Sequence, residues 1–298
     1  MKLYLGLALL SAIFMASSGV IARYSQMAAA ELTFYRLGVG ALCVFIWLLC
    51  TGQARQLWQK PNRQMLQNGL LLASFMLGFL QAIQSIPLAN AIMMVYLAPP
   101  CTALVAHFYF AERLNLFSGM LIMLALLGFA MLQQFQFDVS ANPAQLAGYC
   151  WALLSLLAYS AFLLCNRQPA AGTSVGQRTF YQLLFGACCV LPLLTNSSLP
   201  QGIDWLWVGL AGLFPGFLAI GCAIAALAHL PNRVYGTIAY AEPAAVILAG
   251  WWLFQEQLTP LQLAGISLIL LAGILQALLA GQQPADPDPS QQPARSQA

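Results

Sequence analysis

Charged residues are scarce in this sequence. Asp, Glu, Lys and Arg make up only 6% of the 298 residues, whereas a soluble domain carries roughly 25%. This scarcity argues against a water-soluble enzyme, a disordered protein and a secreted disulfide scaffold. The net charge of +3 is also too small to indicate a nucleic-acid partner.

Motifs for catalysis, nucleotide binding and metal binding are missing as well. The sequence has no Walker loop, no GxSxG elbow, no HExxH and no CxxC pair. Its eight cysteines lie inside apolar runs, which is typical of small apolar residues in a reduced setting. A membrane-embedded hydrolase would need a nucleophile within reach of a base, and the only histidines are His107 and His229. We therefore expect no enzyme, no cofactor and no metal.

Long apolar runs dominate what remains. Hydrophobic residues make up 61% of the chain, and a membrane-spanning helix needs roughly 20 mostly apolar residues. This criterion predicts an all-α integral membrane protein with ten transmembrane helices. The predicted spans cover approximately residues 2–23, 31–51, 65–86, 88–110, 114–134, 144–166, 178–195, 203–229, 232–254 and 260–281.

The basic residues predict an orientation. With the N-terminus in the cytoplasm, nine of the eleven basic residues fall on the inner side, as the positive-inside rule requires. We therefore expect a multi-pass protein of the cell inner membrane with both termini in the cytoplasm. The first span resembles a cleavable signal, but its long apolar core favours a retained helix. The polar, proline-rich residues 282–298 are predicted to be a disordered cytoplasmic tail.

The sequence also matches itself. Residues 33–44 read TFYRLGVGALCV and residues 179–190 read TFYQLLFGACCV. A further set recurs 144 positions later: Pro87, Tyr96, Pro99, Glu112 and Leu114 match Pro231, Tyr240, Pro243, Glu256 and Leu258. We therefore predict two five-helix repeats, 1–137 and 144–281. Because five is odd, the second repeat enters the membrane inverted, which places a substrate site near the midplane between the repeats.

Several of these motifs together identify a family resemblance. The chain resembles the ten-helix branch of the drug/metabolite transporter superfamily, specifically its EamA-type carriers. The residues that carry the resemblance are Arg36, Pro99, Glu112-Arg113-Leu114, Tyr240-Ala241-Glu242-Pro243, Glu256-Gln257-Leu258 and the glycines 128, 265 and 273. One departure is the register of the fifth helix, since Gly119 follows Glu112 by seven positions whereas Gly265 follows Glu256 by nine.

The resemblance implies a secondary transporter of small metabolites that works by alternating access. Amino acids or related metabolites are the cargo it suggests, moved outward. The alternatives are a carrier for choline, nucleotide-type or drug-like solutes, or a non-transporting membrane scaffold. The expected partners are a small-molecule substrate and the lipid bilayer, not nucleic acid, and both a monomer and a homodimer stay open.

Two charges are expected to lie well inside the membrane, where each needs a reason. Glu242 is about ten residues from either end of its span, roughly 15 Å deep. It is either a proton-coupling and substrate-binding group or a structural carboxyl beside the Pro243 kink. Arg36 either binds a substrate carboxylate, or it pairs with Glu31 or caps backbone carbonyls at the outer gate. The matching repeat position holds Gln182, so this charge exists on one side only.

Other candidates are polar side chains at the predicted midplane. Tyr96 and Tyr240 precede the matched prolines, and we expect them to line a central cavity, with ordinary helix packing as the alternative. Pro99 and Pro243 are predicted to kink their helices. The remaining substrate-binding candidates are Gln81, Gln84 and Tyr35, the first two on one helix face because they are three residues apart.

Overall fold

The fold is given by a computed structural model. It describes residues 1–25, 27–58, 60–86, 88–109, 115–135, 143–170, 172–194, 199–255 and 257–282. The predictions for Pro87, Glu112, Arg113, Leu114 and Glu256 fall outside these ranges. The predicted tail does too, except for Gln282, which ends the last helix.

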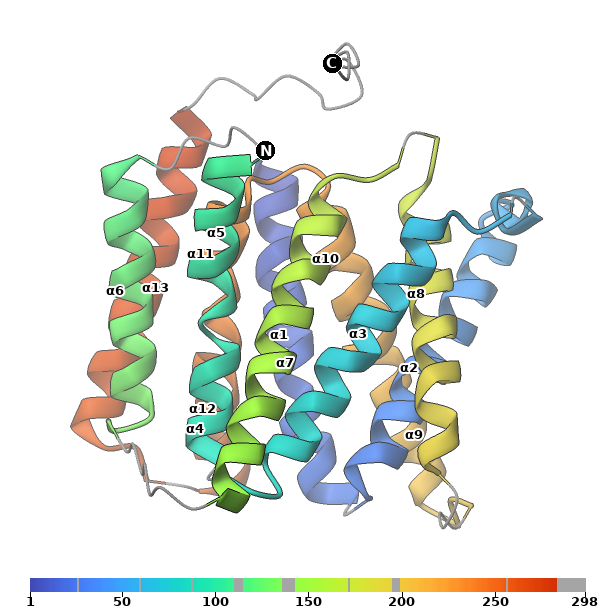
Figure 1. The fold of residues 1–298 in the computed structure, drawn as a ribbon, viewed down its shortest axis with the longest axis horizontal. Helices are drawn as coiled ribbons and strands as arrows, with labels where there is room; N and C mark the ends of the chain where they lie inside the picture. The colour runs from blue at the N-terminus through green and yellow to red at the C-terminus, as the bar shows by residue number, and fades with distance from the viewer. Residues whose placement is uncertain are drawn as a thin grey trace.

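Within the described ranges the chain forms helices and turns only, arranged as a bundle of roughly parallel rods (Figure 1). The all-α membrane fold that the sequence predicts is therefore confirmed. The elements are α1 (Lys2–Ser25), α2 (Ala29–Cys50), η1 (Ala54–Trp58), α3 (Arg63–Ala82), α4 (Leu88–Val95), α5 (Ala98–Tyr109), α6 (Leu116–Leu132), α7 (Pro143–Arg167), α8 (Val175–Val190), η2 (Leu191–Leu193), α9 (Asp204–Ala211), η3 (Gly212–Leu218), α10 (Ala219–Leu227), α11 (Asn232–Ala239), α12 (Ala241–Phe254) and α13 (Pro260–Gln282).

Within the part of the chain that the structure describes, six stretches of helix are long and apolar enough to cross a membrane: α1, α2, α3, α7, the continuous α9–η3–α10 and α13. The other four predicted spans correspond to α6 and α8, which are shorter, and to two broken pairs, α4–α5 and α11–α12. These four segments therefore stay predicted membrane spans, and so does the total of ten.

The two broken pairs are interrupted next to the matched prolines. Pro99 and Pro243 lie in the first turns of α5 and α12, directly after the interruptions, and their role as helix kinks stays a prediction. At a helix start the amide hydrogen that proline lacks is not needed for the helix ladder. The chain therefore breaks at the matched tyrosines, Tyr96 and Tyr240, and each proline belongs to the helix that follows.

Another irregular stretch is η3, where the helix between α9 and α10 widens into a π-helix around Pro215. A π-turn and a proline inside a helix both interrupt the regular hydrogen-bond ladder. The widened turn also carries Gly212 and Gly216, which allow α2 to approach closely.

The helix packing is nearly unchanged when the two predicted repeats are exchanged. The pair α3 and α7 has its counterpart in α1 and α10, and the pair α3 and α8 has its counterpart in α2 and η3. The Ser11 hydroxyl donates to the carbonyl of Ala219 at 2.8 Å, and Ser155 donates to the carbonyl of Phe75 at 2.8 Å. Donors and acceptors are both 144 positions apart, so these bonds favour the predicted duplication.

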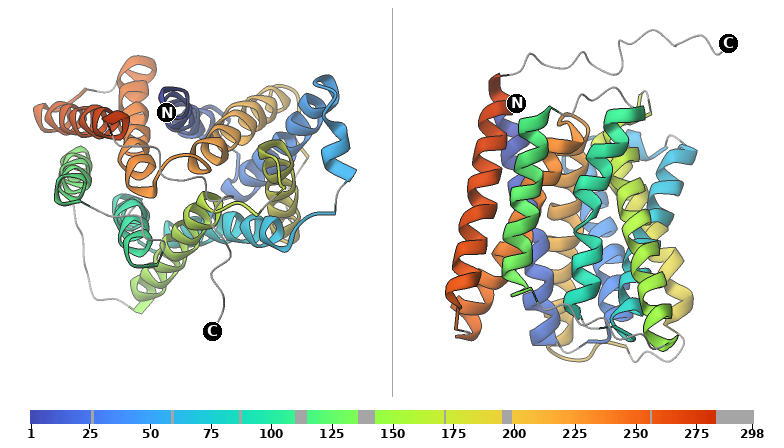
Figure 2. Two further views of the ribbon diagram at one scale, coloured as in Figure 1. Left: turned by 90° about the horizontal axis from the view of Figure 1, so that it is seen from above. Right: turned by 60° about the vertical axis from the view of Figure 1, so that its left-hand side comes forward.

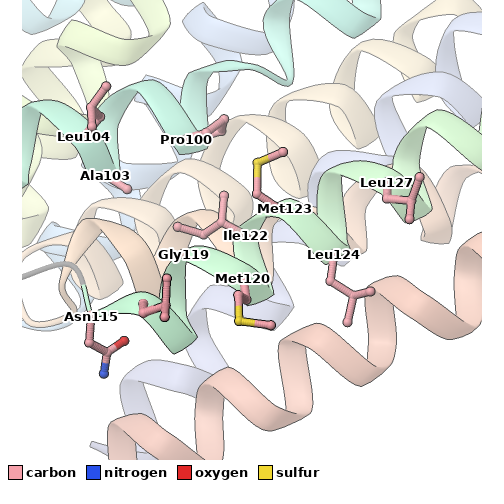
Figure 3. A pocket seen from close by; sticks show the side chains of 11 residues that line it. Pro100, Ala103, Leu104, Asn115, Gly119, Met120, Ile122, Met123, Leu124 and Leu127 are labelled. Carbon is pink, nitrogen blue, oxygen red and sulfur yellow. The ribbon is translucent and has the colours of Figure 1, made fainter.

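The helices α6 and α13 pack on each other at one edge of the bundle (Figure 2). Their backbones meet at two glycines, since a Cβ at Gly128 would lie 2.8 Å from the Gly265 carbonyl oxygen. Beside α6, a groove of about 890 Å³ runs along α5 (Figure 3). Among the described residues that line it, Asn115 alone has a polar side chain, so this lining suits hydrocarbon chains rather than a polar solute.

Candidate functional site

The candidate site lies where the two broken helix pairs pack together. Helix α11 packs on α5, with Gly236 against Pro99, where a Cβ would lie 2.8 Å from the proline Cβ. Next to this contact the matched tyrosines meet, with ring centroids of Tyr96 and Tyr240 5.8 Å apart. The ring of Phe129 lies 4.7 Å from that of Tyr96. Both helix breaks therefore share one aromatic cluster.

The two tyrosines differ in what their hydroxyls contact. The Tyr240 hydroxyl donates to the backbone carbonyl of Tyr96 at 2.6 Å. The Tyr96 hydroxyl lies near the Glu242 carboxyl, close enough for the two groups to interact electrostatically. Tyr240 is fully buried, whereas Tyr96 is half-buried. In this conformation the Tyr240 hydroxyl therefore contacts the Tyr96 backbone, and the Tyr240 side chain does not face an open cavity.

Glu242 lies in the first turn of α12, two residues after the break. The partial positive charge of a helix N-terminus stabilises a carboxylate at this position. Three tyrosines from different parts of the bundle lie close enough to interact electrostatically with Glu242: Tyr96, Tyr159 of α7 and Tyr235 of α11. Phenol groups from three parts of the bundle therefore lie near the carboxyl, which stays partly accessible.

Arg36 of α2 is the cation opposite this carboxyl. Its guanidinium donates to the Ser18 hydroxyl at 3.2 Å and to the Met76 sulfur at 3.2 Å. Its Nε is buried and has no hydrogen-bond partner among the described residues. Arg36 and Glu242 interact through space but form no direct ion pair. The predicted alternative, a pair with Glu31, is not what this conformation shows.

The position of Arg36 is fixed by close backbone packing. A Cβ at Gly216 of η3 would overlap the carbonyl oxygen of Arg36, and a Cβ at Gly40 would lie 3.1 Å from the Gly216 backbone. The matched residue Gln182 has the same arrangement, because a Cβ at Gly69 would lie 2.9 Å from its carbonyl oxygen. In both halves a glycine therefore allows a neighbouring helix to approach the backbone of this polar residue.

Three substrate-binding candidates from the sequence, Gln81, Gln84 and Tyr35, do not contact Arg36 or Glu242 in the part of the chain that the structure describes. Gln81 is half-buried on α3, but Gln84 lies beyond the end of α3 in an exposed turn, so the two do not share a helix face. Tyr35 packs edge-on against Trp205 of α9, with ring centroids 6.4 Å apart. No contact of these side chains with Arg36 or Glu242 is seen in the described residues.

A buried polar network was missed by the sequence reasoning. The Arg178 guanidinium donates to the Asn166 carbonyl at 2.8 Å and to its side-chain oxygen at 3.0 Å. The Gln182 amide donates to the same side-chain oxygen at 2.9 Å. This network joins the end of α7 to α8. The repeat match of Gln182 with Arg36 was a signal for it, but the partner Asn166 had none.

Tyr235 and Ser18 were missed as well. Tyr235 precedes Glu242 by seven residues, which is two helical turns, so it could have been placed on the same face. Ser18 is one of the few polar residues in an apolar helix, and such residues inside a membrane helix seek partners.

Comparisons with known proteins agree that this chain is similar to membrane transporters. A model of the EamA-like transporter family matches residues 2–133 and 146–278. The threonine/homoserine exporter RhtA of Escherichia coli is 26% identical over 268 residues, covering 84% of this chain and 82% of that protein. The pseudopaline exporter CntI of Pseudomonas aeruginosa is 26% identical over 264 residues, covering 84% and 86%.

Two further matches come from an archaeon and from a solved structure. An uncharacterized transporter of Archaeoglobus fulgidus is 27% identical over 274 residues, covering 90% of this chain and 93% of that protein. One crystal structure superposes with a TM-score of 0.84 at 18% identity, covering 95% of this chain and 99% of that one. At this identity the superposition shows a shared fold.

Proposed function

The chain belongs to the EamA-like transporter family and is a multi-pass membrane transporter of small molecules, and we propose that it exports amino acids by alternating access. The proposed substrate is a zwitterion held between Arg36 and Glu242. Its carboxylate would bind the guanidinium and its ammonium would bind the carboxyl. Two relatives of similar length are exporters, of threonine and homoserine in one and of pseudopaline in the other.

The observation that supports this proposal most directly is that Arg36 and Glu242 lie near enough to interact electrostatically but form no direct ion pair. Burying an isolated charge is costly, and a direct ion pair would be the simplest relief. Arg36 instead keeps a buried Nε without a partner among the described residues. A carboxylate between the two groups would complete the guanidinium fork. The tyrosines around Glu242 suit an ammonium group, because aromatic rings attract cations.

The same carboxyl offers a route to energy coupling. Glu242 can carry either a proton or the substrate ammonium, because both neutralise one negative charge. Competition between the two at one site would exchange an entering proton for a departing amino acid.

The test is flux from proteoliposomes that contain the purified protein. The vesicles would be loaded with threonine, homoserine and a mixed panel of other amino acids, choline and nucleosides. Efflux would be read by mass spectrometry with and without an imposed pH gradient. We expect efflux of amino acids that increases with the gradient. Gradient-independent efflux of nucleosides or choline alone would contradict the proposal.

Two variants separate the roles of the two charges. Arg36→Gln places the amide of the matched repeat position at this site, and Glu242→Gln removes the negative charge with little change in shape. We expect each to lower amino-acid efflux by about tenfold or more. An analogue that lacks the carboxylate should lose little in Arg36→Gln, and one that lacks the amine should lose little in Glu242→Gln. Equal losses for all compounds in both variants would contradict a bipolar site. Ser267→Ala, on the exposed face of α13, is the matched control.

The proposal includes an orientation in the cell inner membrane, with both termini in the cytoplasm. The support is the placement of nine of the eleven basic residues on one side. A reporter fused to the C-terminus that is active only in the cytoplasm should be active. A reporter active only outside the inner membrane should be silent, and the reverse pattern would overturn the orientation.

A further inference from the structure

The bond between Tyr240 and the Tyr96 carbonyl has a specific cause in the sequence. In a continuous α-helix the carbonyl of residue 96 would accept from the amide of residue 100. Residue 100 is proline, which has no amide hydrogen. The Tyr96 carbonyl is therefore left without its helical donor. It lies in the middle of a predicted span, where the bilayer core provides no water to replace that donor. The Tyr240 hydroxyl, 2.6 Å away, supplies the missing donor.

The matched position in the second repeat shows the effect of this proline. There residue 244 is alanine, whose amide can donate to the Tyr240 carbonyl. Helix α12 accordingly begins at Ala241, the counterpart of residue 97, whereas α5 begins one position later in repeat register, at Ala98. The second break thus needs no hydroxyl donor, and the Tyr96 hydroxyl lies near Glu242 instead of at the Tyr240 carbonyl.

We propose that Tyr240 is a positioning residue that replaces the amide hydrogen missing at Pro100 and thereby holds Tyr96 against Glu242. The inference rests on the proposed function, because Glu242 is there the group that binds the ammonium or the proton. Hydrogen bonds to an ionised carboxylate are stronger than those to a neutral carboxyl. The charge of Glu242 therefore acts on Tyr96, and through the Tyr96 backbone on the junction of the two broken helix pairs.

The position of the hydrogen bond between Tyr240 and the Tyr96 carbonyl allows the two helix breaks to respond to the charge of Glu242. Tyr96 lies in the break before α5 and Tyr240 is the residue just before α12, so one hydrogen bond joins both hinge points. When a proton binds Glu242, the carboxyl becomes neutral and the interaction with the Tyr96 hydroxyl weakens, while the bond from Tyr240 stays. The backbone of the first break is then held only from the second repeat, which lets α4 and α5 change their angle.

Four proteins test the inference: wild type, Tyr240→Phe, Pro100→Ala, and the double variant. In Tyr240→Phe the carbonyl loses its hydroxyl donor, and we expect efflux to fall about tenfold. Pro100→Ala supplies an amide at position 100, so efflux in the double variant should recover to within about threefold of Pro100→Ala alone. Pro100→Ser offers the same amide and replaces Pro100→Ala if that variant folds poorly.

A matched control separates this role from general packing. Tyr96→Phe removes the hydroxyl that contacts Glu242 but keeps the backbone carbonyl, so Pro100→Ala should not rescue it. Tyr240→Phe should also flatten the dependence of efflux on pH, and the double variant should restore it. If Tyr240→Phe lowers efflux by the same factor in the wild-type background and in the Pro100→Ala background, the inference is wrong.

Failure of the proposed function would be seen separately. If wild type exports no amino acid, the same four proteins are compared by reversible unfolding in mixed micelles. The loss of stability in Tyr240→Phe should again disappear in the Pro100→Ala background. An equal loss in both backgrounds would overturn the inference regardless of the cargo.

Discussion

The contact between η3 and α2 allows a quantitative test of how Arg36 is positioned. The perturbation is Gly216→Ala, which adds one Cβ against the carbonyl oxygen of Arg36 and 3.2 Å from the Cα of Gly40. Both neighbours are backbone atoms, so neither can rotate away as a side chain would. Relief requires that α2 and η3 move apart.

The expected magnitude follows from a matched variant. Gly209→Ala lies on the same span, in α9, and its Cβ would meet nothing within 4 Å. Both variants gain the helix propensity of alanine, up to about 1 kcal/mol, so this gain largely cancels between them. The remaining difference is overpacking, which costs about 1–3 kcal/mol. We therefore expect Gly216→Ala to be less stable than Gly209→Ala by about that amount.

The assay is reversible unfolding of both variants in mixed micelles, combined with efflux from proteoliposomes. Because the displaced atom belongs to Arg36, the folded fraction of Gly216→Ala should also export amino acids more slowly, whereas Gly209→Ala should match wild type. Equal unfolding free energies for the two variants would refute the close approach of the helices. Normal efflux in a destabilised Gly216→Ala would refute its link to Arg36.

Further predictions concern buried polar contacts. Asn166→Ala should cost about 2–3 kcal/mol of unfolding free energy, because Arg178 and Gln182 lose their shared acceptor; an unchanged unfolding midpoint would count against the network. Ser11→Ala and Ser155→Ala should each cost about 1 kcal/mol, and nearly the same amount, because their bonds are exchanged by the repeat. A large difference between them, measured by the same unfolding, would speak against equivalent environments.

Much of the fold could be predicted from the sequence because membrane helices are specified locally. Apolar length indicated the spans, and the offset of 144 paired Tyr96 with Tyr240 before any contact was known. The matched prolines indicate that each helix is interrupted but not at which residue. Proline lacks the amide that would donate one turn earlier, so the interruptions lie before the prolines, at Tyr96 and Tyr240.

The site was predictable in its charges but not in its contacts. Arg36 and Glu242 stood out because charge inside a membrane is rare. Their juxtaposition depends on how α2 and α12 are arranged in space, which no local pattern encodes. Gln84 was assigned to a helix face that ends at Ala82, and Asn166 gave no signal because its value as an acceptor depends on Arg178 and Gln182.

The mismatch between Pro100 and Ala244 has an evolutionary consequence. A duplication supplies two tyrosines with identical surroundings. Because only the first repeat has a proline at this position, Pro100, the two tyrosines then tolerate substitution differently. While residue 100 is proline, exchange of Tyr240 for phenylalanine is a harmful step, and the same exchange becomes tolerable once an amide returns there. Among descendants of the duplicated gene, proline at position 100 should therefore occur together with tyrosine at position 240 more often than chance allows, and the order of the two substitutions should not be reversible.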